Sequence, residues 1–185
     1  MRNRVSVFAA VFLALLAGAA SAQDKPQTLV RTTDQAPIDG TIAAGEYSLT
    51  VDLPKAKLAL QWSADTLAIA VTAETKGWVA IGLGSRKMDK SVIFIGYVTG
   101  DQAQMKIQKG ASHSHGDLDS KAMTSYAVAE KGKDTTMEVA LNASSFIAAD
   151  QTVLDLIVAF GGSDSFSAFH RYRTQRSVAL QRSAP

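Results

Sequence analysis

The sequence offers few side chains that could do chemistry, and none of its 185 residues is a cysteine. The chain therefore has no disulfide, no thiolate metal site, no iron–sulfur cluster and no covalent haem attachment. Two of its three histidines stand in His113-Ser114-His115, and this spacing places both imidazoles on one face of an extended segment. With Asp117 or Asp119 the pair could hold a divalent metal ion. A solvated loop over residues 110–120 is the commoner explanation of such a pair.

The third histidine, His170, and a loop methionine, Met88, each follow a strongly apolar run. Their spacing alone does not distinguish them from ordinary surface residues. The sequence has no Gly-x-Ser-x-Gly elbow for an activated serine, no phosphate-binding glycine loop and no paired metal motif of the helical kind. Hydrolytic and nucleotide-binding chemistry therefore have no support in the motifs.

The elements that must position these side chains are predicted to be strands. Apolar residues alternate with polar ones over residues 49–53, 58–62 and 67–73, the pattern of half-buried strands. Residues 78–83 and 92–98 are more continuously apolar, which predicts strands covered on both faces. Further short runs lie at residues 103–107, 126–128, 137–141, 153–160 and 177–180. About ten short strands and no competing helix predict an all-β sandwich in a single domain.

The N-terminus predicts export. Arg2 and Arg4 precede an apolar run over residues 5–16 and a small-residue site, which together predict a signal peptide over residues 1–22 with cleavage after Ala22. Residues 23–37 predict a flexible, solvated leader, and residues 38–182 the folded domain. We expect a periplasmic or secreted protein with no membrane span in the mature chain. Without the two signal-peptide arginines, 17 basic residues balance 17 acidic ones, so nucleic acid is a poor candidate partner.

Several separated motifs occur in an order that resembles the DOMON domain in its bacterial stand-alone form. They are residues 77–84 (Gly-Trp-Val-Ala-Ile-Gly-Leu-Gly), Met88 and residues 95–98, flanked by Ile38-Asp39-Gly40, Gly45-Glu46-Tyr47, residues 135–139, residues 158–161 and His170. The resemblance spans about residues 38–181. It implies an immunoglobulin-like β-sandwich of about ten to eleven antiparallel strands that binds a b-type haem or a sugar.

In the haem-binding branch, such as the cytochrome domain of cellobiose dehydrogenase, a Met shortly after the Gly-Trp motif and a His near the C-terminal end ligate the iron. Met88 and His170 occupy the matching positions, so the resemblance implies that they are the metal ligands of a non-covalent haem b. The related gamma subunit of ethylbenzene dehydrogenase uses Met with Lys. Relatives usually follow the His with x-x-Arg-Gly, and here no Gly follows, so either Arg173 or Arg176 could be the matching arginine.

Met and His ligation describes an electron carrier and not an enzyme. A thioether stabilises ferrous iron and thereby raises the reduction potential, and six-coordination leaves no open position for a substrate. The macrocycle needs an apolar clamp, and a planar guanidinium suits its propionates. Each aromatic candidate taken alone is at least as well explained as ordinary core. The candidates for the clamp are Trp78, Phe94, Tyr97, Phe160 and Phe169, and those for the propionates are Arg173 and Arg176.

Strand counting raises a difficulty for this pair. If ten strands alternate in direction, the Met88 loop follows the fourth and the His170 loop the ninth, so the loops lie at opposite ends. We therefore expect a further short strand within residues 109–124, a broken one near residues 148–152, or a connection that crosses between sheets without reversing direction.

The alternative function is a carbohydrate- or other small-ligand-binding module in which Met88 and His170 are incidental. Trp62, Trp78 and Tyr97 would then be the rings to stack on a sugar. The expected partners are a redox protein or membrane cytochrome in the first case and a sugar in the second.

Overall fold

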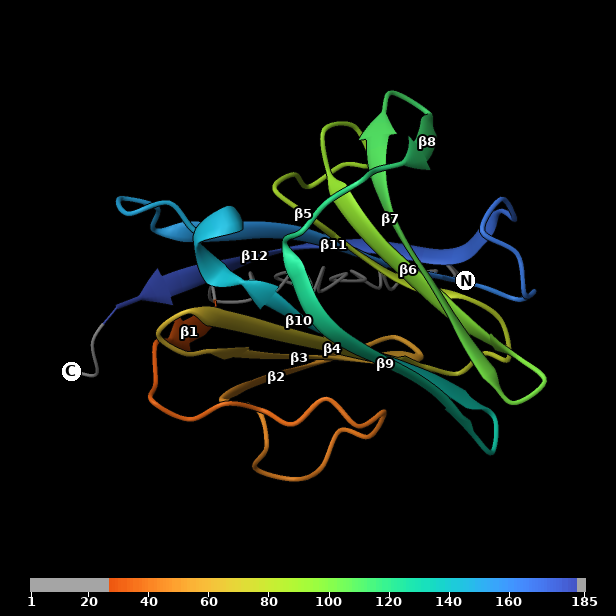
Figure 1. The fold of residues 1–185 in the computed structure, drawn as a ribbon, viewed down its shortest axis with the longest axis horizontal. Coiled ribbons are helices and arrows are strands. Elements are labelled where there is room, and N and C mark those ends of the chain that lie inside the picture. Colours follow the sequence, from red (N-terminus) through yellow and green to blue (C-terminus); the bar gives the residue numbers. More distant parts are fainter. Residues whose placement is uncertain (1–26, 183–185) are drawn as a thin grey trace, which may run out of the picture.

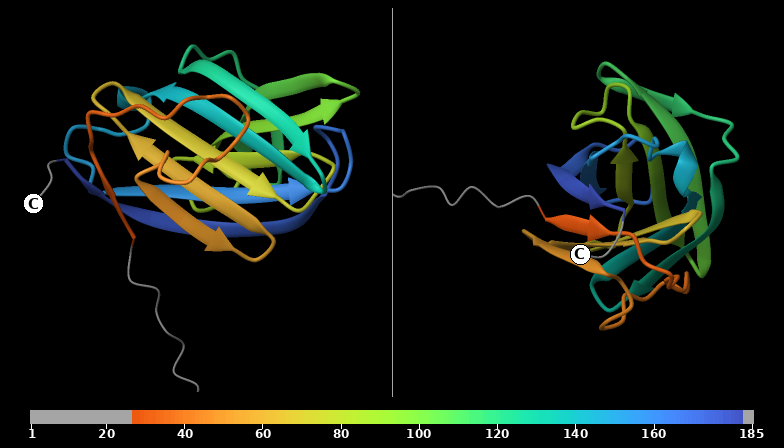
Figure 2. Two further views of the ribbon diagram at one scale, coloured as in Figure 1. Left: turned by 90° about the horizontal axis from the view of Figure 1, so that it is seen from below. Right: turned by 90° about the vertical axis from the view of Figure 1, so that its left-hand side faces the viewer.

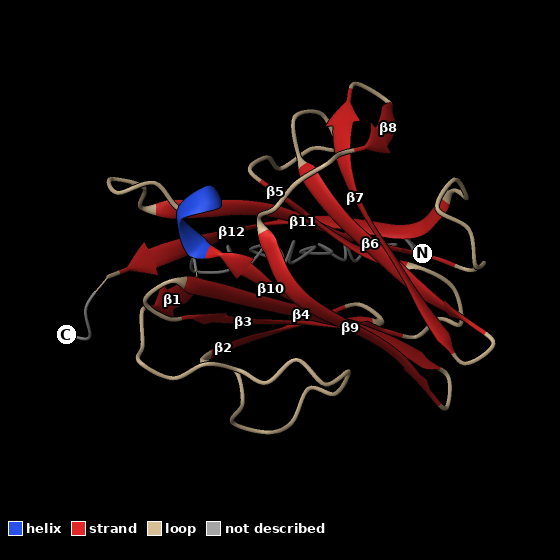
Figure 3. Cartoon of the chain, in the orientation of Figure 1, coloured by secondary structure: helices blue, strands red, loops and turns tan. Residues whose placement is uncertain are grey.

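The computed structural model describes residues 27–182, which form twelve strands in two sheets packed face to face (Figure 1 and Figure 3). The predicted all-β sandwich is confirmed. Within the described range the helical structure is one 3-10 turn, Ala143–Ser145. The predicted signal peptide and the start of the predicted leader lie outside the described residues.

The larger sheet has seven strands in the order β1-β12-β11-β5-β6-β7-β8. Their bounds are β1 Thr28–Val30, β12 His170–Gln181, β11 Val153–Gly161, β5 Val79–Leu83, β6 Val92–Thr99, β7 Gln102–Ala111 and β8 Ser114–Asp117. The smaller sheet has five strands in the order β2-β3-β4-β10-β9. Their bounds are β2 Leu49–Leu53, β3 Ala56–Trp62, β4 Thr66–Ala73, β10 Asp134–Asn142 and β9 Met123–Lys131. Neighbouring strands are antiparallel except β1 and β12, which pair in parallel.

The main core lies between the two sheets, because alternate residues of facing strands point inward. On the larger sheet Ile81, Phe94 and Leu156 are fully buried there, and Leu60 and Met137 meet them from the smaller sheet. The ring of Phe94 lies edge-on to Phe146 with 5.9 Å between centroids. This core makes the sandwich rigid enough to hold loops at its ends.

The chain from residue 31 to 48 covers the outside of the five-stranded sheet (Figure 2, left). A fully buried carboxylate, Glu138 of β10, holds it there. Glu138 accepts hydrogen bonds from the backbone N–H groups of Asp39 (2.9 Å) and Gly40 (2.6 Å) and from the hydroxyl of Tyr47 (2.7 Å). Three motifs that are far apart in the sequence therefore meet at one hydrogen-bonded point.

The structure differs from the sequence-based expectation at both edges of the larger sheet. Residues 28–30, expected in a solvated leader, form β1, and Leu29 is fully buried. A short strand does occur within residues 109–124, namely β8, but it only extends the edge of the sheet beyond β7. It does not bring the Met88 and His170 loops to the same end. β1 escapes prediction because three residues carry no apolar period. The short strand expected from strand counting within residues 109–124 does form, although its four exposed polar residues carry no such period either.

Candidate functional site

The seven-stranded sheet has a second apolar face, turned away from the main core. We call it the outer face. Its buried members are Trp78, Ala80, Ile93 and Ile95, with Met88, Tyr97, Ala159, Phe166 and Ala168 packed against them. It arises because β5 is buried at all five positions and β6 and β11 are apolar on both sides over much of their length. No second sheet covers this face; side chains such as Met88, Phe166 and Ala168 bury it instead.

The loop that carries Met88, residues 84–91, is fastened to the end of β7. Lys90 N–H donates to the Gly110 carbonyl (3.0 Å), Gly110 N–H donates to the Ser91 carbonyl (2.9 Å), and Ser112 N–H donates to Asp89 Oδ1 (2.8 Å). Gly110 is required there, because a Cβ at that position would lie 1.8 Å from the Met88 carbonyl oxygen. The same Cβ position lies 3.3 Å from Met88 Cγ. The methionine side chain is therefore held against β7, at the edge of the outer face.

A cavity of about 750 Å³ opens beside this methionine, within the volume range of small-molecule sites. Its lining contains Arg86, Lys87, Met88, Asp89, Ser112, His113, Ile157, Arg173, Thr174 and Gln175. The predicted ligand Met88 and the predicted propionate partner Arg173 thus line one cavity. His113 lines it too, whereas His170 does not.

His170 lies at the opposite end of the same sheet. β11 is antiparallel to β5, with Phe160 beside Val79, so the loop after Gly161 lies next to the start of β5 while residues 84–91 follow its end (Figure 1). His170 pairs with Gly161, and cross-strand partners share a face. A Cβ on Gly161 would point at the Trp78 ring, which belongs to the outer face. His170 therefore stands on the outer face, at the far end from Met88.

The His170 side chain is exposed and makes no hydrogen bond within the described residues. Its neighbour Phe169 is 93% exposed and packs on nothing that would make it part of a clamp. Phe166, which the sequence did not single out, instead packs against Tyr97 with 4.6 Å between ring centroids and 51° between the ring planes. The segment 162–169 thus covers the Tyr97 end of the outer face and leaves the imidazole free.

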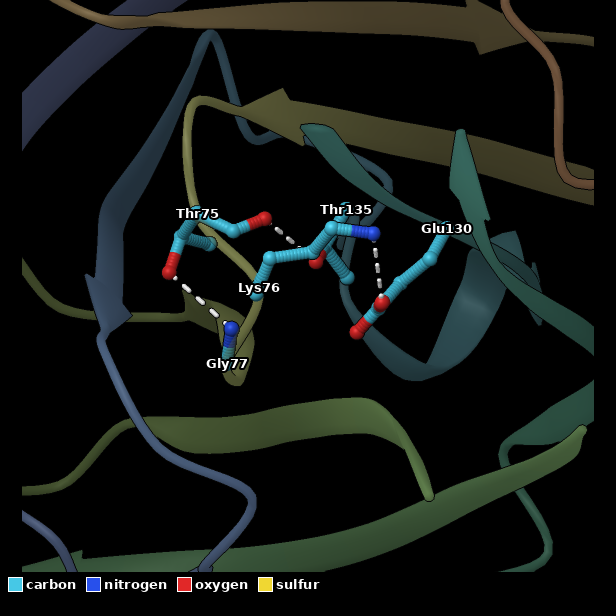
Figure 4. Close-up of polar contacts among 5 residues, drawn as sticks. All are labelled: Thr75, Lys76, Gly77, Glu130 and Thr135. Atoms are coloured by element: carbon cyan, nitrogen blue, oxygen red, sulfur yellow. Dashed lines mark hydrogen bonds and ion pairs between the residues drawn. The ribbon is translucent and has the colours of Figure 1, made fainter. Parts of the chain in front are cut away.

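Trp78 is positioned by the turn that precedes it (Figure 4). Gly77 N–H donates to Thr75 Oγ1 (3.0 Å), Thr135 Oγ1 donates to the Thr75 carbonyl (2.8 Å), and Lys76 pairs with Glu130 at 3.1 Å. A Cβ on Gly77 would lie 2.3 Å from the Ser163 nitrogen, so this turn and the loop before His170 pack backbone to backbone. The Gly-Trp motif therefore fixes the floor of the outer face and one of its ends together.

The remaining predicted residues lie on different sides of the seven-stranded sheet. Phe94 and Phe160 point into the main core, where Phe160 stacks on Tyr172 at 5.2 Å, and neither lines the outer face. Arg173 pairs with Ala159 of the outer face, whereas Arg176 pairs with Leu156, a core residue. The alternation of β12 therefore makes Arg173, and not Arg176, the arginine on the side of Met88.

The histidine pair of the β7–β8 hairpin forms a polar edge to this face. His115 Nδ1 lies 2.6 Å from Gln108 Oε1, Gln108 Nε2 donates to Asp117 Oδ1 (2.9 Å), and Lys106 donates to Asp117 Oδ2 (2.6 Å). The hydrogen bond from Lys106 lowers the pKa of the Asp117 carboxyl. Among the described residues no three His, Asp or Glu side chains gather as a metal site.

Sequence reasoning missed the aliphatic floor of the outer face, which Ala80, Ile93, Ile95, Ile157 and Ala159 form. The signal was present in the continuous apolar runs of β5, β6 and β11, which are neighbours in the sheet. Such runs indicate burial on both sides but do not say what covers the second side.

No family model matches the sequence, and no curated protein is similar to it in sequence. Solved structures are similar in fold. The cytochrome domain of Myriococcum thermophilum cellobiose dehydrogenase matches with a TM-score of 0.57 at 11% identity, over 74% of this chain and 84% of that one. The cytochrome b domain of pyranose dehydrogenase from Coprinopsis cinerea matches with a TM-score of 0.53 at 10% identity, over 67% and 76%.

A carbohydrate-binding module of family 9 from Caldicellulosiruptor kristjanssonii, in complex with glucose, also matches, with a TM-score of 0.51 at 11% identity over 85% of this chain and 97% of that one. The fold is thus shared by cytochrome domains and a carbohydrate-binding module. The resemblance to DOMON domains is confirmed at the level of fold. Within residues 27–182 we find no helix long and apolar enough to cross a membrane.

Proposed function

We propose that this chain is an exported electron-transfer domain that binds haem b non-covalently on the outer face of its seven-stranded sheet, and that Met88 and His170 would hold the iron. The observation that supports this most is that Met88 lines a cavity together with Arg173 and packs on an apolar face that also carries His170. The structure places these two side chains at opposite ends of β5, so both could hold one haem only if their segments moved toward each other over this face. The structure therefore keeps the difficulty raised by strand counting, and the proposal requires this movement when haem binds.

The residues present fit this group by their donor chemistry. Met88 offers a neutral thioether beside a cavity, and the His170 imidazole has no competing hydrogen bond among the described residues. Between them lie aliphatic side chains and Trp78, which are buried under Met88, Phe166 and Ala168, so haem would have to displace these residues to contact them. Arg173 at the cavity would hold a propionate. When bound, haem supplies one-electron exchange between ferric and ferrous iron.

The chain's own residues then have distinct tasks. Gly110 and Asp89 hold the Met88 loop, the Gly77 turn holds Trp78 against the loop before His170, and the aliphatic floor excludes water from the face. If Met88 and His170 both held the iron, no site would remain for a substrate, so the proposal makes the domain a carrier and not an enzyme.

The test is reconstitution of the purified protein with haemin, followed by visible spectra in the oxidised and dithionite-reduced states. We expect one haem per chain and the sharp reduced bands of low-spin iron. A protein that binds no haemin, or binds it only as high-spin iron, would contradict the proposal.

The second candidate function, binding of a carbohydrate, is favoured by the match to the glucose-bound module. Of the rings named for it, Trp62 is 2% and Trp78 5% exposed, and the half-buried Tyr97 packs against Phe166, so a sugar, like haem, would reach Trp78 only after the residues packed on it moved. Calorimetric titration with glucose and with cellotriose should give no heat of binding. Saturable binding of either sugar would favour the carbohydrate-binding alternative.

A further inference from the structure

Positive charge is concentrated at the mouth of the Met88 cavity. Arg86, Lys87 and Arg173 line the cavity. Lys90 lies in the Met88 loop, residues 84–91. The side chain of Lys109 contacts this loop, since its Nζ donates a hydrogen bond to the Lys90 carbonyl at 2.6 Å. We call these five residues the basic rim. All five are exposed.

Few carboxylates balance this charge. Asp89 lines the cavity, but its Oδ1 already accepts the Ser112 N–H. Asp155, two positions before Ile157 on β11, accepts a hydrogen bond from the Ser177 hydroxyl at 2.6 Å. The ion pairs formed within residues 27–182 use Lys57, Lys76, Lys106 and Lys133, and none uses a member of the basic rim. The rim therefore keeps an excess of positive charge.

Part of the rim is held in place without an acidic partner. The side-chain amide of Gln175 on β12, oriented to satisfy both of its atoms, donates to the Arg86 carbonyl (3.0 Å) and accepts from the Arg86 guanidinium (3.0 Å). Haem carboxylates that pair with Arg173 would still leave Arg86, Lys87, Lys90 and Lys109. Fixed unpaired cations around a cleft attract anions and speed their encounter with it.

The geometry points to the basic rim as the docking surface for the electron-exchange partner, which we infer to be a protein with an acidic patch. This inference rests on the proposed function, because a haem held by both Met88 and His170 would have no small substrate and would have to exchange electrons with a partner protein. Complementary charge accelerates association and selects the partner, and salt screens both effects.

Two oxidants of opposite charge test the sign of this surface. The reduced, haem-loaded protein gives one electron either to ferricyanide, which becomes ferrocyanide, or to tris(phenanthroline)cobalt(III), which becomes the cobalt(II) complex. In stopped-flow measurements we expect the rate with ferricyanide to fall with added salt. Arg86→Glu combined with Lys87→Glu should lower that rate by about 3- to 10-fold and raise the rate with the cobalt complex.

The matched control is Lys57→Glu combined with Lys131→Glu, which makes the same charge change on the five-stranded sheet. We expect it to alter either rate much less than the rim variant does. Equal effects of the two variants, or no effect of the rim variant, would overturn the docking surface while leaving haem binding intact.

A second measurement needs no haem, so it separates failure of the docking surface from failure of the proposed function. Hexacyanochromate(III), a paramagnetic trianion, is titrated into the ¹⁵N-labelled apoprotein. Amide signals of residues 86–90, 109–113 and 173 should broaden first and recover with salt. Uniform broadening, or broadening centred elsewhere, would overturn the inference whether or not haem binds.

Discussion

Gly110 shows at the scale of one residue how tightly the Met88 loop is placed. An added Cβ would lie 1.8 Å from the Met88 carbonyl oxygen, and backbone cannot move aside as a flexible side chain can. Gly110→Ala should therefore destabilise the fold by about 1–3 kcal/mol and weaken haem binding. Gly116→Ala, on the paired strand with open space around its Cβ position, is the control. Urea unfolding and haemin titration measure both effects; equal behaviour of the two variants would contradict this role.

Single residues also show where sequence reasoning reached its limit. Both Met88 and His170 were expected in loops, and Met88 does lie in one, whereas His170 is the first residue of β12; the aromatic candidates Phe94 and Phe160 were given the same rank as Trp78 and Tyr97. One step along a strand decides which side of the sheet a residue faces. That choice becomes visible only when register is known, as it now is for Arg173 and Arg176.

At the scale of elements, β1 is the strand that the sequence pattern does not predict. Its central residue, Leu29, is fully buried beneath the sheets. Leu29→Ala should lower the free energy of unfolding by about 2–5 kcal/mol, whereas Val153→Ala, at a position 44% exposed, should change it by less than about 0.5 kcal/mol. Chemical denaturation decides this. An unchanged free energy of unfolding in Leu29→Ala would mean that residues 28–30 belong to a solvated leader, as the sequence predicted.

The stability that the segment over the five-stranded sheet contributes should decrease at alkaline pH. Burial and the hydrogen bond to Glu138 raise the pKa of Tyr47 far above its ordinary value, which is about 10. A group with a raised folded-state pKa contributes its full stability below the unfolded pKa and loses it as pH rises. Tyr47→Phe should thus cost about 1–3 kcal/mol at pH 7.

Above about pH 10 the difference between wild type and Tyr47→Phe should shrink by up to about 1.4 kcal/mol per pH unit. Urea unfolding at neutral and alkaline pH measures this difference, with the exposed Tyr126→Phe as control. A gap that stays constant with pH would show that the Tyr47 hydroxyl is not buried against Glu138.

The elements that sequence predicts best are those with a clear period. The alternating runs of β2, β3 and β4 and the continuous runs of β5, β6 and β11 all become strands. β8 carries Ser114, His115, Gly116 and Asp117, all exposed, so its formation depends on pairing with β7 and not on burial. Edge strands of this kind leave no apolar signal in a sequence.

At the scale of the whole molecule, a ligand that binds only the folded state must stabilise it. Free haem at about 100 times its dissociation constant should add about 2.7 kcal/mol to the free energy of unfolding. Thermal unfolding with haemin, and separately with glucose, measures this shift. We expect a higher Tm with haemin alone; a rise with glucose and none with haemin would favour the carbohydrate-binding alternative.

The most direct test of the central claim asks which histidine holds the iron, because His113 lines the cavity of Met88 and His170 stands at the far end of the face. The measurement is the visible spectrum of the dithionite-reduced, haem-loaded protein for wild type, Met88→Ala, His170→Ala and the double variant His113→Ala with His115→Ala. We predict that the low-spin bands vanish in Met88→Ala and His170→Ala and persist in the double variant. Loss of those bands in the double variant, with an unchanged spectrum in His170→Ala, would contradict the account and move the ligand to the β7–β8 hairpin.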